Sequence, residues 1–350
     1  MITLASVYWL AAVLVFAADP YDLYPWGASV ELSTHDSPRD AALHLINVVA
    51  KKPAASLILI GGSTTARYTP KELAESLALE GRVYNVSYAA PRPSDRFIVL
   101  NKFLENPPQR IMIVFDWMYA QQRNELRPDF PIYLYDKSPF NDLRAVNPDG
   151  IRRSIRVLLG ETIFSEAEAF ARYKNNLSKS YAKFQSPESI KKLDGLIEAG
   201  RGTIDAKPEV DLECNNFTAI ANDLIPAVKG FAESGTLVDI IIPAYSFAFY
   251  YEWRSQISDT LLEDQLVTRS CLVEGLDGVA NTRIFAFDAI DWVSGDLSNY
   301  WDTGHIYREK PLQYILTAIA EDRHRLTKVN LEDYIRGLRE QVKTVVVRNK

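Results

Sequence analysis

An aspartate and a histidine three residues apart, Asp302 and His305, form the pair in this sequence best suited to acid–base chemistry. A carboxylate at that spacing can bond one imidazole nitrogen and leave the other nitrogen free to take up a proton. Such a pair needs a nucleophile within its reach, as in a Ser-His-Asp triad. Ser63 is the candidate nucleophile, because it follows an apolar run and two glycines, which allow a sharp turn that points a hydroxyl at a cleft.

Five short, mostly apolar runs predict the sheet that must bring these distant residues together. Strands that are covered on both faces are rich in apolar residues. The runs are 56–60, 83–86, 110–115, 238–242 and 282–287. Helical patterns alternate with them, which predicts an α/β fold with a mostly parallel five-stranded sheet. Ligand sites in such sheets lie at the carboxyl ends of the strands, where Ser63, Ser87 and Asp116 stand.

The chain divides into five predicted segments around this alternation. Residues 21–122 and 237–325 form the two parts of the α/β domain. Between them, residues 123–236 form a mostly helical insertion that could cover the site. Residues 1–20 form an apolar N-terminal segment, and residues 326–350 form a C-terminal helix.

Composition narrows the classes of function. The net charge is -6 with both signs interspersed, and the absence of a basic run argues against nucleic acid. The two cysteines, Cys214 and Cys271, have no metal-ligand spacing, and no metal or other cofactor is expected. We expect two ordinary thiols, with one disulfide as the alternative.

The N-terminal segment has three interpretations. Ile2 to Ala18 carries no charge and stands at the short limit for crossing a bilayer. We expect an uncleaved, single-pass anchor in the inner membrane, with the catalytic domain periplasmic or extracellular. A cleaved signal peptide is the second interpretation, although no basic residue precedes the segment. A core helix is the third, although the segment has no polar face.

These motifs resemble the sequence blocks of the SGNH/GDSL hydrolase superfamily. Gly61-Gly62-Ser63 stands at the first block, with Gly62 where the family usually has aspartate, and Asp302-Thr-Gly-His305 matches the fourth block. More narrowly, the chain is similar to the membrane-anchored bacterial branch that accompanies O-acetylation of polysaccharides and cell walls, including alginate acetylation proteins and DltD-like proteins. The resemblance covers about residues 56–320. It implies a three-layer, flavodoxin-like sandwich.

The second and third blocks depart from the family pattern. Ser87 stands where the family usually has a glycine whose amide serves the oxyanion hole. Asp116 stands where the family has the asparagine of Gly-x-Asn, and an ionised aspartate has no hydrogen to donate. The resemblance therefore implies an oxyanion hole built from the amides of Ser63 and Ser87, with the contribution of Asp116 left open.

The implied chemistry is acyl transfer. His305 would take the proton of Ser63, Asp302 would hold the imidazole, and Ser63 would attack an ester carbonyl. We expect an esterase or O-acetyltransferase acting on acyl esters of an extracytoplasmic polysaccharide or cell-wall glycan, with a membrane-bound O-acyltransferase as partner. One alternative is a catalytically weak glycan-binding or scaffold subunit of an acetylation complex, which Asp116 favours. The other is a soluble lipid esterase, against which the apolar N-terminal segment argues.

Aromatic residues near the strand ends are candidates for binding sugar rings. Trp117 and Tyr245 follow strands, and Trp301 directly precedes Asp302. Their apolar faces could stack on a sugar. The alternative is that they pack around the cleft.

Overall fold

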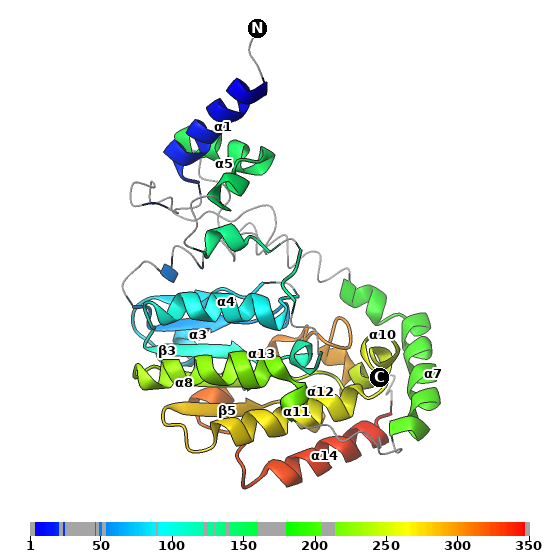
Figure 1. The fold of residues 1–350 in the computed structure, drawn as a ribbon. Helices are drawn as coiled ribbons and strands as arrows, with labels where there is room; N and C mark the ends of the chain where they lie inside the picture. The colour runs from blue at the N-terminus through cyan, green and yellow to red at the C-terminus, as the bar shows by residue number, and fades with distance from the viewer. Residues whose placement is uncertain are drawn as a thin grey trace.

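One parallel sheet of five strands forms the centre of the protein (Figure 1). The computed structural model describes residues 4–20, 24, 46, 49–50, 54–88, 90–121, 125–128, 130–136, 141–159, 180–204 and 214–346. The strands are β1 (Leu57–Ile60), β2 (Val83–Asn85), β3 (Arg110–Val114), β4 (Leu237–Ile242) and β5 (Thr282–Ala286). All five coincide with the apolar runs of the sequence, so the predicted α/β fold is confirmed.

The order of the strands locates the crevice where a ligand can bind. The order is β2-β1-β3-β4-β5, and every neighbouring pair is parallel. This is the flavodoxin-like order, in which the chain moves outward from β1 to β2 and then returns to β3 on the other side of β1. The loops after β1 and β3 therefore diverge and leave a crevice at the carboxyl ends of these two strands.

Helices cover both faces of the sheet and complete three layers. Alternate strand residues such as Ile58 and Ile60 point to a face covered by α4 (Pro93–Leu104), α8 (Ile225–Glu233) and α11 (Leu261–Leu276). Leu57 and Leu59 point to the opposite face, which α3 (Pro70–Ser76) and α13 (Glu309–Ala320) cover. The other helical segments are η1 (Trp117–Ala120), η2 (Ile132–Leu134), η3 (Asn141–Ala145), α5 (Pro148–Leu158), α7 (Pro187–Ile204), η4 (Cys214–Asn216), a π-helical turn (Ala219–Leu224), α9 (Phe249–Glu252), α10 (Arg254–Ile257), α12 (Asp291–Ser294), η6 (Leu297–Asn299) and α14 (Leu331–Thr344).

The helices of the predicted insertion, residues 123–236, have different partners, and α7 packs against α9. Its last helix, α8, packs against β4 and α4 and belongs to the sandwich. Its helix α5 lies beside the N-terminal helix at one end of the molecule, away from the sheet (Figure 1). Residues 160–179 and 205–213, also within the predicted insertion, lie outside the described residues.

The N-terminal helix corrects the predicted localisation. Helix α1 runs from Leu4 to Ala18 and has 15 residues. At about 1.5 Å per residue it is shorter than the roughly 30 Å hydrocarbon core of a bilayer. In the part of the chain that the structure describes, no helix is long and apolar enough to cross a membrane. The predicted single-pass anchor, on which the inner-membrane localisation rested, is therefore wrong.

Contacts along one side of α1 explain part of its apolar sequence. Ala12, Val15 and Ala18 are buried. Val15 joins a small apolar cluster with Leu134 and Ala145. The apolar residues on this side of the helix therefore serve packing within the protein.

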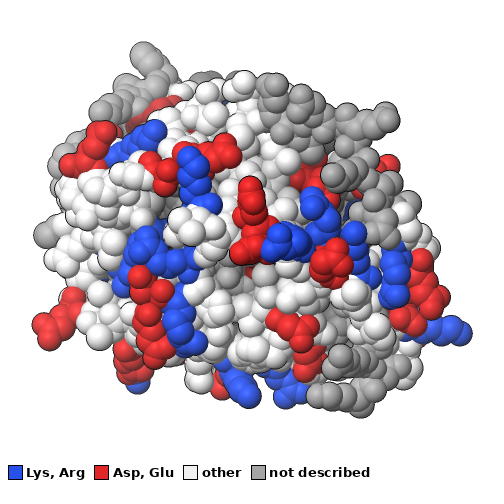
Figure 2. Space-filling view, turned by 90° about the horizontal axis from the view of Figure 1, so that it is seen from below, with Lys and Arg blue, Asp and Glu red and all other residues white. Residues whose placement is uncertain are grey.

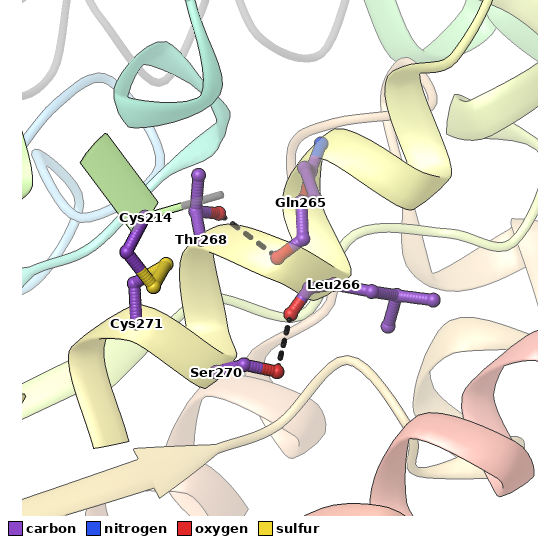
Figure 3. Close-up of a disulfide and its surroundings, with 6 residues drawn as sticks. All are labelled: Cys214, Gln265, Leu266, Thr268, Ser270 and Cys271. Atoms are coloured by element: carbon purple, nitrogen blue, oxygen red, sulfur yellow. Dashed lines mark hydrogen bonds between the residues drawn. A yellow bond between two sulfur atoms is a disulfide. The ribbon is translucent and has the colours of Figure 1, made fainter. Parts of the chain in front are cut away.

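A disulfide joins Cys214 to Cys271, so the expectation of two free thiols is wrong (Figure 3). Cys214 begins η4, and Cys271 lies on the side of α11 that faces it. The Cα atoms are 5.4 Å apart, within the range that a disulfide requires. The bond therefore ties the end of the insertion to a helix of the central sandwich.

Charged residues of both signs are interspersed on the face of the molecule shown in Figure 2. Lys and Arg side chains there alternate with Asp and Glu and with uncharged surface. The mixture agrees with the interspersed charges of the sequence.

Candidate active site

Ser63 and His305 meet at the carboxyl end of the sheet. The Ser63 hydroxyl oxygen lies 2.7 Å from His305 Nε2, although the two residues are 242 positions apart in the chain. Ser63 follows β1, while His305 lies in a loop after β5. Both side chains are partly exposed, so a substrate can approach them.

Asp302 orients the imidazole. His305 Nδ1 lies 2.8 Å from each carboxylate oxygen of Asp302. A carboxylate accepts hydrogen bonds, so this contact keeps a proton on Nδ1 and leaves Nε2 to accept the proton of Ser63. The backbone amides of Gly304 and His305 also donate to Asp302 Oδ1, both over 2.8 Å, and hold the carboxylate in place.

Residues 300–306, the histidine loop, are fixed to the sandwich at several points. Tyr300 and Ile306 form a β-bridge that closes the loop. The carbonyl oxygen of the fully buried Thr303 accepts hydrogen bonds from the amide and the hydroxyl of Ser246, over 3.0 and 2.8 Å. The hydroxyl of Thr303 donates to the carboxylate of Glu252. The loop that carries His305 is thus anchored to the segment after β4.

Residues 61–65, the serine turn, need a glycine at their start. A methyl group at Gly61 would lie 2.0 Å from Thr65 Oγ1 and 2.8 Å from Val114. The amide of Thr65 donates to the carbonyl of Gly62 over 3.1 Å and tightens the turn. The backbone thus passes so close to β3 that only glycine fits at position 61.

The amide and the hydroxyl of Ser87, a predicted oxyanion-hole residue, both have hydrogen-bond partners within the protein. Its amide donates to the side-chain oxygen of Asn85 over 3.0 Å. Its hydroxyl lies 3.0 Å from Thr65 Oγ1 in the buried interior. The predicted contribution of the Ser87 amide is therefore not available in this arrangement. The two-residue spacing of Asn85 and Ser87 could have indicated this bond in the sequence, because an asparagine side chain often bonds the backbone two residues further on.

Asp116 is also engaged. Its carboxylate pairs with Arg96 of α4, and both side chains are buried. Its other oxygen accepts from the amide of Met118 over 3.1 Å and caps η1. Burial opposes the charge of Arg96, but Asp116 and Tyr119 raise the pKa of the guanidinium above its ordinary value. Asp116 therefore acts as a structural anion beside the serine turn.

Arg96, which sequence reasoning missed, brings this ion pair close to Ser63. A methyl group at Gly62 would lie 3.2 Å from Asp116 Oδ2 and 3.5 Å from Arg96 Nη2. Arg96 Nη1 also donates to the carbonyl of Val114 over 2.6 Å. The ion pair of Arg96 and Asp116 therefore packs against the serine turn at Gly62. No pattern in the sequence marks an arginine of an amphipathic helix as fully buried.

The donors of the serine turn itself remain for an oxyanion. Among the described residues, no partner bonds the amides of Ser63 and Thr64. The Thr64 hydroxyl oxygen is buried and has no hydrogen-bond partner among the residues that the structure describes. The amides of Ser63 and Thr64 and the hydroxyl of Thr64 are therefore the hydrogen-bond donors available to an oxyanion next to Ser63.

The three predicted sugar-binding aromatics differ in exposure. Tyr245 is 1% exposed and its phenol oxygen accepts from the amide of Trp117 over 3.2 Å, so it cannot contact a sugar. Trp301 is partly exposed, and its ring meets the edge of His305 at 5.1 Å between centroids. Trp117 is partly exposed and lies 5.9 Å from the ring of Trp253.

Trp253 joins the site through the histidine loop. Its indole nitrogen donates to Thr303 Oγ1 over 3.2 Å. Sequence reasoning missed this residue because it lies within an apolar, aromatic helical stretch, where a core position is the ordinary expectation. Trp117 and Trp253 together form a partly exposed aromatic surface next to the loop of His305.

Comparison with known proteins adds no homologue. No family model matches the chain, and no curated protein matches it. Within the described part of the chain, no three His, Cys, Asp or Glu side chains gather where they could hold a metal ion. The arrangement of the side chains therefore carries the argument for function.

Proposed function

We propose that this protein is an SGNH-type serine esterase or O-acyltransferase that acts on acyl esters of a carbohydrate. The observation that carries the proposal is the continuous hydrogen-bonded series from Ser63 through His305 to Asp302, with contacts of 2.7 and 2.8 Å. In the reaction, His305 Nε2 takes the hydroxyl proton while Ser63 Oγ attacks the ester carbonyl. Protonated His305 then gives the proton to the departing alcohol, and an acyl-enzyme remains.

The second half of the reaction decides between hydrolysis and transfer. His305 takes a proton from water or from a sugar hydroxyl, and that oxygen attacks the acyl-enzyme and frees Ser63. The partly exposed side chains of Trp117 and Trp253, which lie next to each other beside the histidine loop, support a carbohydrate as the alcohol part of the ester.

Hydrolysis of p-nitrophenyl acetate by the full-length protein tests the proposal. We expect release of p-nitrophenol, and a loss of roughly 10³-fold or more in kcat for Ser63→Ala. Ser76→Ala, at the partly buried end of α3, is the matched control and should keep the wild-type rate. Equal rates for wild type and Ser63→Ala would contradict an esterase.

A catalytically weak glycan-binding subunit is the second candidate. It is favoured by the hydrogen bonds that engage the amide of Ser87, an expected oxyanion group, and the carboxylate of Asp116, whose contribution was open. In that case, calorimetric titration with an acetylated oligosaccharide should give the same affinity for wild type and Ser63→Ala, without turnover by either protein.

A further inference from the structure

An apolar cavity lies beside the serine turn and the histidine loop, lined by residues adjacent to Ser63 and His305. The described strands contribute Leu59, Met112 and Ile241 to its walls, and α13 contributes Ile315 among others. These side chains belong to the core on the α3 and α13 face of the sheet. The cavity therefore lies between the sheet and α13.

The serine turn and the histidine loop form one wall of this cavity. Thr64 and Thr65 follow Ser63, and Gly304 and Ile306 flank His305; all four line the cavity. An acyl group esterified to Ser63 Oγ thus lies beside an apolar space that no described side chain fills. We propose that this cavity receives the acyl chain of the substrate, which deepens and rests on the proposed esterase function.

The size of the cavity sets the length of the acyl chain. Its volume is about 20 Å³. A water molecule needs roughly 10–15 Å³ on this measure, so there is room for one or two non-hydrogen atoms. The methyl group of an acetyl fits this space. A butyryl chain has two more methylenes and would displace packed side chains, so the substrate is a short-chain ester.

One polar atom gives the acyl group an orientation. Thr64 Oγ1 is buried, and its residue lines the cavity; no group in the described part of the chain bonds it, whereas buried hydroxyls ordinarily have a partner. A bound acyl group supplies the missing acceptor through its carbonyl oxygen. The hydroxyl of Thr64 then donates to that oxygen, on which negative charge develops during attack by Ser63.

A comparison of chain lengths tests the cavity. For p-nitrophenyl acetate and butyrate, we expect kcat/KM to favour acetate by at least about 10-fold in the wild type. Met112→Ala enlarges the cavity and should reduce that ratio by about 10-fold. Ile113→Ala is the matched control, because its side chain points to the opposite face of the sheet, and it should leave the ratio unchanged. Ile315→Val makes a milder enlargement should Met112→Ala fail to fold.

Two results would overturn the inference while leaving the proposed function intact. One is a Ser63-dependent wild-type activity that is equal on acetate and butyrate. The other is an equal change of the ratio in Met112→Ala and Ile113→Ala. Absence of Ser63-dependent turnover on every ester would instead contradict the esterase itself.

The role of Thr64 is tested by isosteric replacement. Thr64→Val keeps the shape and removes the hydroxyl, and we expect kcat on acetate to fall by about 10²-fold. Thr64→Ser keeps the hydroxyl and should stay within a few-fold of the wild type. A wild-type rate for Thr64→Val would show that the hydroxyl does not contact the acyl oxygen.

Discussion

The two sides of Ser63 differ in how completely they are prepared for acyl transfer. On the side of the base, His305 and Asp302 are already in hydrogen-bonding contact, and Ser246 fixes the loop between them. On the oxyanion side, Ser87 and Asp116 are committed to Asn85 and Arg96. The protein thus has a preorganised proton path, while its oxyanion stabilisation depends on donors within the serine turn.

This difference predicts which residues the proposed esterase activity should depend on most. A single oxyanion donor contributes about 10²–10³ to kcat in serine hydrolases. Because the amide of Ser87 and the carboxylate of Asp116 are engaged elsewhere, replacing a triad residue should lower the rate strongly. Replacing Ser87 or Asp116 should lower it only weakly. The variants below test this contrast from the largest expected effect on activity to the smallest.

Asp302→Asn should reduce kcat on p-nitrophenyl acetate by about 10³–10⁴-fold. The amide oxygen can still accept from the backbone of Gly304 and His305, so the loop is retained. The amide nitrogen of the new asparagine then faces His305 Nδ1 and forces the imidazole proton onto Nε2. A protonated Nε2 cannot accept the hydroxyl proton of Ser63. Circular dichroism and thermal melting would verify the fold. A loss below 10-fold would mean that Asp302 does not set the tautomer.

Asp116→Asn should mainly lower stability. It leaves Arg96 charged and buried without its anion, which costs about 3–5 kcal/mol, measurable by urea unfolding. The kcat of the folded protein should remain within about 10-fold of the wild type, since Asp116 does not donate to the oxyanion.

Asp239→Asn is the matched control for that experiment. Asp239 is fully buried and pairs with Arg110 and Arg283, away from the serine turn. It should show a comparable loss of stability and no change in kcat. A fall in kcat for Asp116→Asn as large as that for Asp302→Asn would place Asp116 among the catalytic groups and remove the contrast between the two sides.

Replacement of both cysteines, Cys214→Ser with Cys271→Ser, should leave kcat unchanged. The bond closes a loop of 57 residues, and its loss should destabilise the protein by about 4 kcal/mol. Reduction of the wild type should lower its melting temperature to that of the double variant. The same treatment should have no effect on the double variant itself. A reduced kcat would link the disulfide to the site.

The sheet and the central residues of the site could be predicted from the sequence. Each strand lies within one residue of its predicted run at either end, because helices cover both faces of the sheet and most strand positions are therefore apolar. Ser63 and His305 follow strands of one parallel sheet, and this geometry alone brings them to the same edge.

The errors have physical causes that local patterns do not contain. The Cys214 to Cys271 bond depends on the packing of two distant segments. The N-terminal segment was assigned to a membrane from its apolar residues, but Val15 packs against Leu134 and Ala145 instead.

The separation of Ser63 from His305 also has a consequence for biosynthesis. The two residues are 242 positions apart, and at about 5–20 residues per second the ribosome needs roughly 10–50 s to travel from one codon to the other. During that interval the nascent chain holds an unactivated serine and no base. The proposed esterase turnover would therefore appear only once β4, β5 and the histidine loop have been made and have docked. Such turnover would thus be a direct readout of completed folding in a cell-free translation reaction.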